Sequence, residues 1–564
     1  MTDPHHAAAG VTDPALADLL VDHWEERMRR SPQWATALGD RRYDGLLDRG
    51  GPEAVAQESL WRAQVLSRVG ALDRRHLGDT DMTTLELFEG ELRRDKRAEV
   101  CHGEQWGLSA RSNPLLGVQQ LPTSHTLDDE ARAGTYLARV RQLPRTFTES
   151  EADLRAGMAA GRVPTAHAVR LVIEQVDRAL AVPESEWEVA RPDTSKLTAA
   201  AEFSVQLAPL VTALRPTIVA YRAFLADELL PVARDDAHEG TWAVADGETC
   251  YAALIELHTT LPKSAEAIHA TGLEEMERIH AEMRVLGARL FGTSDLAEIF
   301  RRLRDDPELH FKTREEVLAK AEGALAAARA RIPAWFGVLP EADCLVRPIP
   351  DYEAPYTTIA YYWPAVPKSQ PGYYYVNTWE PETRPRFEAE VLAFHESIPG
   401  HHLQIAIAQE QPGLPAFRRH GMTTAYVEGW ALYTERLADE MGLYSGDLDR
   451  MGMLSFDSWR AARLVVDTGI HAMRWSRGDA ERWMRENTPL AENNIVNEVD
   501  RYISWPGQAL AYKIGQIEMW RLRREAEARL GPRFDIRAFH DVVLGGGAVS
   551  LPVLERRVHT WAER

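Results

Sequence analysis

Apolar residues recur at three- and four-residue steps along most of the chain, which is the period of amphipathic α-helices. The clearest example spans residues 313–332, where Thr313 and Glu316 form a capping-box pattern and Pro333 follows. Residues 346–383 are the exception, because they carry seven prolines, clustered aromatic residues and no helical period. Within them, the aromatic and β-branched run 373–378 predicts a strand. We therefore expect a mostly α-helical protein with one small β-sheet.

No low-complexity linker interrupts the 564 residues, although this length exceeds what one compact core usually fills. We expect a flexible N-terminus over residues 1–11 and a helical N-terminal lobe over residues 12–340. A C-terminal lobe over residues 341–564 is expected to hold the chemistry.

Charge and composition narrow the classes of function. The 65 Lys and Arg residues against 85 Asp and Glu residues give a net charge of −20, and no basic run offsets it, so nucleic-acid binding is disfavoured. The three cysteines form no CxxC pair, which argues against a disulfide framework and favours a reducing compartment. The sequence has neither a signal-peptide pattern nor a run of 18 apolar residues, so no membrane segment is predicted. A cytoplasmic protein without a membrane partner is expected.

The chemistry is concentrated in residues 388–409, EAEVLAFHESIPGHHLQIAIAQ. His395 and Glu396 are expected near the end of a helix. On an unbroken helix, His401 and His402 would lie about 9 and 10.5 Å further along the axis, too far to share a metal with His395. A break at Pro399-Gly400 would let one of them return toward His395, and the choice between them stays open. The alternative is an ordinary helix–turn–helix junction with exposed histidines.

A third metal ligand is offered by the next helical run, TAYVEGWALYTERL, residues 424–437. Glu428 stands between Val427 and Gly429, where a lone carboxylate is costly unless it is paired or metal-bound. Glu435 is seven residues later on the same face, and either orients a ligand or is a surface carboxylate.

Several sequence motifs together resemble those of a known family. They are HESIPGHHLQ, YVEGWALYTERL, PGYYYVNT, RYISWPGQALAYKIG, Phe539-His540-Asp541 and Leu551-Pro552. They resemble a bacterial family described as domain of unknown function 885, which is similar to the gluzincin peptidases. The resemblance covers residues 310–560 well, and the N-terminal half only by length and helical character. It implies a large, two-lobed, metallopeptidase-like helical fold with the small sheet beside the active-site helices.

The resemblance also implies a ligand set. Matching Gly400-His401-His402-Leu403 to the gluzincin pattern makes His395, His401 and Glu428 the ligands of one Zn²⁺ per chain, with His402 and Glu435 as alternative or supporting groups. Glu396 would be the general base that takes a proton from water and delivers it to the leaving amine.

Further candidates lie outside the motif. Tyr512 is our choice for the donor to the oxyanion, or else is a packed tyrosine. Arg501 and Lys513 are candidates to bind a substrate carboxylate. Additional substrate-binding candidates are Tyr502, His471 on the helix 454–475, and Asn377 at the end of the predicted strand.

No GxSxG, GxxxxGK[ST] or GxGxxG pattern is present, so serine hydrolase, P-loop and Rossmann functions lack support. The sequence favours a zinc-dependent peptidase that hydrolyses short peptides. The alternatives are a zinc amidase or esterase acting on a non-peptide substrate, and a non-catalytic helical binding protein.

Overall fold

The computed structural model describes the whole chain except residues 1–3, 352–353, 355–358 and 366–369. The chain divides into two compact units. The first contains residues 1–251 and 503–505, and the second contains residues 252–502 and 506–564. This division lies within α12 (Gly247–Thr259) and differs from the expected boundary near residue 340. Residues 252–340 belong to the second unit because α13 (Ala265–Phe291) packs along α20 (Asp447–Ala472).

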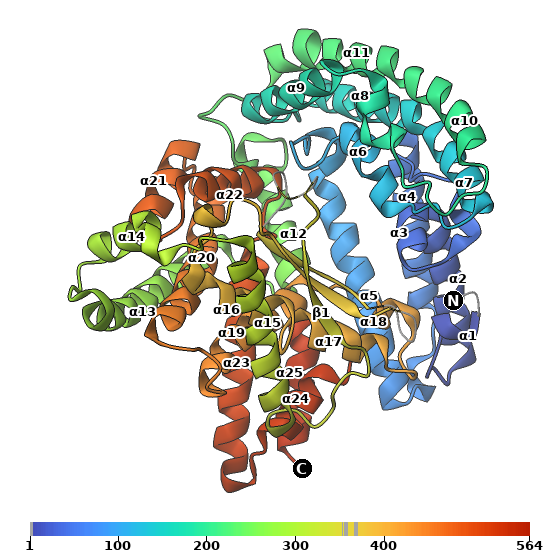
Figure 1. The fold of residues 1–564 in the computed structure, drawn as a ribbon. Coiled ribbons are helices and arrows are strands. Elements are labelled where there is room, and N and C mark those ends of the chain that lie inside the picture. Colours follow the sequence, from blue (N-terminus) through green and yellow to red (C-terminus); the bar gives the residue numbers. More distant parts are fainter. Residues whose placement is uncertain (1–3, 352–353, 355–358, 366–369) are drawn as a thin grey trace. The chain divides into compact units, whose positions relative to one another are not determined.

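The first unit is helical (Figure 1). Its helices are α1 (Pro4–Ala7), α2 (Pro14–Arg30), α3 (Pro32–Ala37), α4 (Pro52–Gly70), α5 (Asp79–Ala98), α6 (Pro114–Ser124), α7 (Glu130–Val140), α8 (Leu143–Ala159), α9 (Ala166–Leu180), α10 (Ala200–Thr212) and α11 (Leu214–Phe224). Side-chain caps begin several of them; Asp13, for example, accepts a 2.8 Å hydrogen bond from the backbone N–H of Leu16.

One stretch of the described chain, Ala200–Val232, is long and apolar enough to cross a membrane by length and composition alone. It contains α10 and α11, whose side chains Leu207, Leu214 and Ile218 belong to the buried core of the first unit. Only 28% of its apolar window is buried, and Val205 and Val219 are exposed, so packing in that core accounts for part of its apolar character.

Cys101 and Cys250 form a disulfide in the first unit, with Cα atoms 4.7 Å apart, and Cys344 is buried and free. The expectation that the cysteines are not disulfide-bonded is therefore wrong for this pair. The two residues are 149 positions apart in the sequence, but the fold places the turn after α5 against the start of α12. Distance along the chain gave no indication of this contact.

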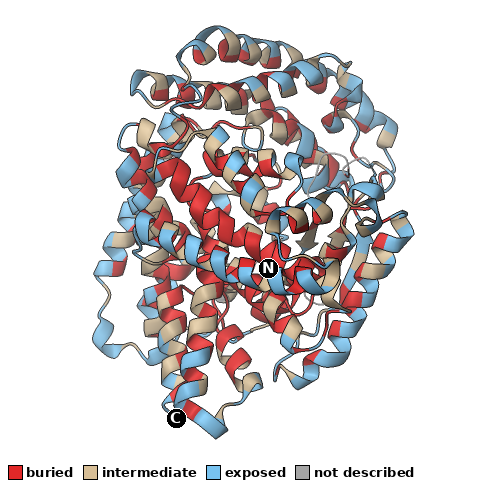
Figure 2. Cartoon of the chain, turned by 90° about the vertical axis from the view of Figure 1, so that its left-hand side faces the viewer, coloured by how far each residue is buried: buried red, intermediate tan, exposed pale blue. Residues whose placement is uncertain are grey.

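The second unit combines helices with the small sheet. Its remaining helices are α14 (Leu296–Asp305), α15 (Arg314–Arg331), α16 (Ala389–Glu396), α17 (His401–Gln409), α18 (Ala416–Arg419), α19 (Thr424–Glu440), α21 (Arg477–Asn487), α22 (Glu492–Ser504), α23 (Leu510–Leu530), α24 (Ile536–Leu544) and α25 (Leu551–Ala562). Helix α20 is buried from Met451 to His471 at nearly every position, whereas surface helices alternate buried and exposed residues (Figure 2).

The sheet has three strands in the order β1-β3-β2. Strand β1 (Cys344–Pro348) pairs in parallel with β3 (Gly372–Val376), and β2 (Ala360–Trp363) pairs with β3 in the antiparallel direction. The predicted strand is thus confirmed, and it is the central strand rather than an edge. The sequence also identified α15 correctly, since Thr313 caps it by accepting a hydrogen bond from the N–H of Glu316.

Two glycine contacts set the spacing of the helices that carry the candidate site. Gly429 of α19 lies against Gly515 of α23, so that a Cβ atom at either position would overlap backbone of the other helix. Gly452 of α20 similarly lies against the carbonyl group of Phe387, just before α16. Side chains that begin beside these contacts are therefore held close to those of the neighbouring helix.

The disulfide gives a direct test. Protein produced in an oxidising compartment, then unfolded and treated with an alkylating reagent, should take up one label per chain, on Cys344, and three labels after reduction. Mass spectrometry of the intact chain and of its peptides measures both. Three labels without reductant would contradict the pairing.

Candidate metal centre

The break between α16 and α17 brings two histidines together. Helix α16 ends at Glu396 and α17 begins at His401, with a cis peptide bond between Ile398 and Pro399. At Gly400 the chain passes so close to its own preceding turn that a Cβ atom would overlap the carbonyl oxygen of His395. As a result, the imidazole rings of His395 and His401 lie edge to face with centroids 4.7 Å apart.

Glu428 of α19 completes a cluster with these two rings. Its Oε2 atom is 3.8 Å from Nε2 of His395 and 3.5 Å from Nε2 of His401, and one ligand atom from each residue lies within 4.8 Å of the others. Ligand atoms around a tetrahedral zinc ion at about 2.1 Å are about 3.4 Å apart. The observed separations are close to this value.

Two polar atoms of the cluster support its fit to a cation. Glu428 Oε2 and His401 Nδ1 are buried and have no hydrogen-bond partner among the described residues. Buried polar atoms of this kind normally have a partner, because leaving them without one is costly. A cation between Glu428 and the two imidazoles would supply the missing partner of Oε2.

Glu435, one of the predicted supporting residues, fixes the orientation of His395. Its Oε1 atom lies 2.8 Å from Nδ1 of His395, and its side chain is completely buried. This contact leaves Nε2 of His395 facing the cluster, which is the arrangement that metal-binding histidines usually adopt. Burial raises the pKa of Glu435 to about 8. The surface interpretation of Glu435 is not supported by this burial.

The protonation of two of the three residues suits metal binding; in His401, burial lowers the pKa but the Glu428 carboxylate outweighs this and raises it above the usual value. Burial, together with the charge of His401, holds the pKa of His395 well below its usual value, so this ring is neutral. Burial opposes ionisation of Glu428, but His401 and the Tyr512 hydroxyl lower its pKa below the usual value. A neutral imidazole and a carboxylate are the forms that coordinate zinc.

His402, the competing ligand, faces another direction. Its Nδ1 atom is 3.0 Å from the hydroxyl of Tyr362 and its Nε2 atom is 3.1 Å from the carbonyl oxygen of Ala342. Both ring nitrogens of His402 are thus engaged in contacts with protein groups. The geometry favours His401 as the partner of His395.

Glu396 follows His395 directly and is held beside the cluster. The charge of His401 and the backbone N–H of Tyr362 in β2 lower the pKa of its carboxylate, and the charge of Glu428 raises it. Burial raises the pKa of Glu396, which favours a role in accepting and returning a proton.

Tyr512 of α23 lies beside Glu428. Its hydroxyl interacts with the Glu428 carboxylate and lowers the pKa of that group, and it accepts from Nη2 of Arg501 at 3.4 Å. Arg501 also binds Glu498 and Gln508. Among the predicted substrate-binding residues, Arg501 therefore contacts Tyr512, the residue that lies beside Glu428.

The other substrate-binding candidates have structural roles. Lys513 is completely buried and pairs with Asp457 at 2.5 Å and with Glu275 at 2.9 Å. Tyr502 is buried and its hydroxyl donates to Glu498 at 2.6 Å. These contacts engage the polar ends of Lys513 and Tyr502 inside the protein.

His471 and Asn377 are likewise buried. Nε2 of His471 lies 2.9 Å from the carbonyl oxygen of Tyr502, and the Asn377 amide donates to the carbonyl oxygen of Ala354 at 2.7 Å. Asn377 follows the central strand of the sheet, as the predicted strand 373–378 placed it at a strand end. Packing and backbone contacts explain both side chains.

Two residues near the cluster were missed by the sequence reasoning. Tyr374 on β3 has a buried hydroxyl without a hydrogen-bond partner among the described residues, and it interacts electrostatically with Glu396. Arg460 on α20 is 5% exposed and interacts electrostatically with His395 and Glu396. A charged residue within the apolar run of α20 was the available signal for Arg460.

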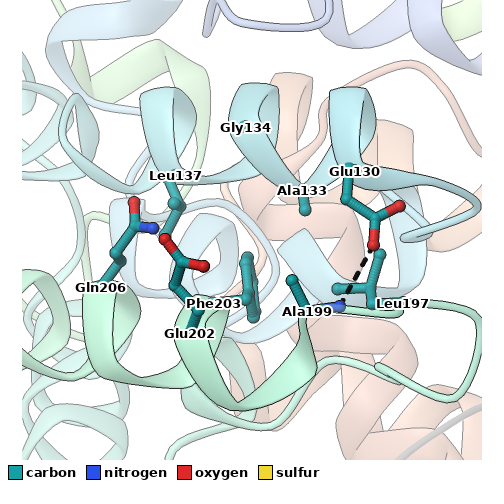
Figure 3. Close-up of a pocket in the computed structure, with 9 residues that line it drawn as sticks. All are labelled: Glu130, Ala133, Gly134, Leu137, Leu197, Ala199, Glu202, Phe203 and Gln206. Atoms are coloured by element: carbon teal, nitrogen blue, oxygen red, sulfur yellow. Dashed lines mark hydrogen bonds between the residues drawn. The ribbon is translucent and has the colours of Figure 1, made fainter.

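A hollow in the first unit is unrelated to this chemistry (Figure 3). Its volume is about 210 Å³, and one of its two carboxylates, Glu130, accepts hydrogen bonds from Thr198 and from the backbone N–H of Ala199. It is lined by Glu130, Ala133, Gly134, Leu137, Leu197, Ala199, Glu202, Phe203 and Gln206. None of these residues is a histidine or a cysteine.

The chain is similar to a known protein family and to solved structures. The model of a family described as bacterial protein of unknown function (DUF885) matches residues 32–558. A crystal structure described as "the putative lipoprotein from Colwellia psychrerythraea" is 27% identical, with a TM-score of 0.91 over 97% of this chain and 98% of that one. A "putative lipoprotein of unknown function from Shewanella oneidensis" is 18% identical, with a TM-score of 0.76 over 96% and 99%, and shows the same fold. No curated protein matches.

The close approach at Gly400 leads to a testable expectation. Gly400→Ala should push His401 away from His395 and lower the affinity for zinc by at least about tenfold, as measured by calorimetric titration. Gly478→Ala is the matched control, because a Cβ atom there has only the Ser476 hydroxyl within 4 Å, at 3.8 Å. Unchanged zinc affinity in a folded Gly400→Ala variant would contradict the geometry.

Proposed function

The chain belongs to the DUF885 family, and we propose that it is a zinc-dependent peptidase that hydrolyses short peptides. The observation that carries the proposal is the convergence of His395, His401 and Glu428, with Glu396 held beside them. The choice of a peptide as substrate rests on the resemblance of the motif to those of gluzincin peptidases.

Zinc is the metal favoured by this donor set. Two imidazole nitrogens and one carboxylate oxygen form the ligand set of several catalytic zinc sites, which keep a further position open. Zinc bound to these three residues would supply a Lewis acid that lowers the pKa of water toward neutrality. One such site per chain is proposed.

Glu396 is the proposed general base. Desolvation raises the pKa of this half-buried carboxylate above its usual value, which favours taking up a proton from water. The same carboxylate then returns the proton to the nitrogen of the leaving amine.

Tyr512 is the proposed donor to the oxygen of the scissile carbonyl group. Its hydroxyl interacts with the Glu428 carboxylate and lowers the pKa of that group, and its ring packs under the guanidinium of Arg463 at 4.4 Å. A donor held in this way needs little reorganisation when charge develops on the carbonyl oxygen.

We also propose that the protein works outside the cytoplasm. The Cys101–Cys250 disulfide is typical of oxidising compartments, and both similar structures are described as putative lipoproteins. The earlier expectation of a cytoplasmic protein relied on the cysteine count and is not supported by these findings.

Metal content and turnover test the function together. Protein purified without a chelator or a His-tag should hold about one zinc per chain by elemental analysis, and a library of short peptides should be cleaved in its presence. Glu396→Gln should keep the metal and lower kcat by about 10²–10⁴-fold, because it removes the general base.

Glu563→Gln is the matched control, since this residue is 66% exposed and pairs only with Arg529 at 3.3 Å among the described residues. Its turnover should equal that of the unmodified protein. Cleavage of non-peptide amides or esters alone would replace the peptidase proposal by the alternative hydrolase. Equal behaviour of Glu396→Gln in every assay would favour a non-catalytic binding protein.

A further inference from the structure

One face of α20 presents two arginines next to the metal-ligand cluster. Phe456, Trp459, Arg460 and Arg463 follow one another at the spacing of a single helical face. The guanidinium carbon of Arg460 lies 4.2 Å from the ring centroids of both Phe456 and Trp459. That of Arg463 lies 4.8 Å from Trp459 and 4.4 Å from Tyr512. Aromatic rings thus hold both guanidinium groups in fixed positions.

Several donors of these arginines are unused. Nε and Nη1 of Arg460 and Nη1 of Arg463 are buried and have no hydrogen-bond partner among the described residues. Arg460 is only 5% exposed and Arg463 only 2% exposed, so bulk water does not satisfy these donors. Buried charged donors without acceptors are costly, and their presence indicates a place for an acceptor.

The charges around this face do not balance. Glu498 accepts from Arg463 at 2.8 Å and from Arg501 at 3.4 Å, so one carboxylate serves two arginines. Arg460 forms no ion pair within 4.0 Å with any residue that the structure describes. Burial lowers the pKa of Arg460, and the charges of Glu435 and Glu498, which raise it, do not offset this effect.

The unused donors lie close to the proposed site of hydrolysis. Tyr512 connects the two places, because its ring packs against Arg463 while its hydroxyl lowers the pKa of Glu428. Arg460 is near enough to influence the charges of His395 and Glu396. A molecule that places an anionic group on these arginines would therefore be able to reach the metal-ligand cluster with another part.

We propose that Arg460, assisted by Arg463, binds a carboxylate of the substrate, and that this contact selects peptides with a carboxylate near the scissile bond. The planar guanidinium group offers parallel N–H donors that match a carboxylate. The carboxylate is either the free carboxyl terminus or an acidic side chain, and both have the same chemistry at this subsite. The inference rests on the proposed peptidase function.

The test compares three peptide pools that share their neutral sequences. One pool has free carboxyl termini, the second is amidated, and the third is amidated but carries a glutamate at each position in turn. With zinc-loaded protein, cleavage followed by mass spectrometry should be about tenfold to a hundredfold faster for a pool with a carboxylate than for the neutral amidated pool. The faster pool identifies the source of the carboxylate. Equal rates in all three pools would overturn the subsite and leave the peptidase function intact.

Substitutions of Arg460 test whether this residue causes the preference for peptides with a carboxylate. Arg460→Gln should remove the preference, and Arg460→Lys should reduce it, because lysine keeps the charge without the planar pair of donors. Arg529→Gln removes a half-exposed arginine at the end of α23 and should leave the preference unchanged. A folded Arg460→Gln variant that still prefers the carboxylate pool would overturn the assignment.

Binding distinguishes failure of the subsite from failure of the function. The zinc-loaded Glu396→Gln protein is dialysed against the three pools, and retained peptides are measured without any need for turnover. Preferential retention of a carboxylate pool supports the subsite even if no peptide is cleaved. Equal retention of the pools, or retention of none, contradicts it.

Discussion

On one continuous helix, two imidazoles six residues apart would lie too far apart and on different faces. The candidate site therefore depends on a break in the helix between His395 and His401. The chain interrupts the helix between Glu396 and His401 and folds so tightly that only glycine fits at position 400. The break returns His401 to the face of His395. The remaining parts of the site are then arranged around this pair.

Close helix packing also positions Glu428, the third residue of the cluster. Gly429 follows Glu428 directly and lets α19 lie against α23 at Gly515, three residues after Tyr512. The carboxylate and the tyrosine are therefore brought together by a backbone contact. Glu428 is next to Gly429, and Tyr512 is within one turn of Gly515. A displacement of either helix would therefore move one of these side chains and alter the cluster.

The electrostatics of this buried polar centre would favour bound charges. Glu435 orients His395 from a fully buried position, and Glu428 keeps its charge although it is largely removed from water. On the other side, Arg460 and Arg463 contribute positive charge that Glu498 alone does not balance. A cation in the cluster and an anionic group on the arginines would each satisfy groups that the protein leaves without partners.

Local patterns allowed much of this arrangement to be predicted. The helical period, the capping residues of α15, the aromatic strand and the break at Pro399-Gly400 are encoded within short windows, and each was recognised. The contacts that were missed join distant segments. Cys101 meets Cys250, Lys513 meets Asp457, and the sheet places β3 between its two partners. No window of sequence contains these pairings, so periodicity and residue type could not reveal them.

Anomalous scattering at the zinc absorption edge, recorded from crystals equilibrated with zinc, tests the central claim most directly. The account predicts one strong peak at about 2.0–2.2 Å from Nε2 of His395, Nε2 of His401 and a carboxylate oxygen of Glu428. A peak on His402, or none between these three residues at saturating zinc, would contradict it.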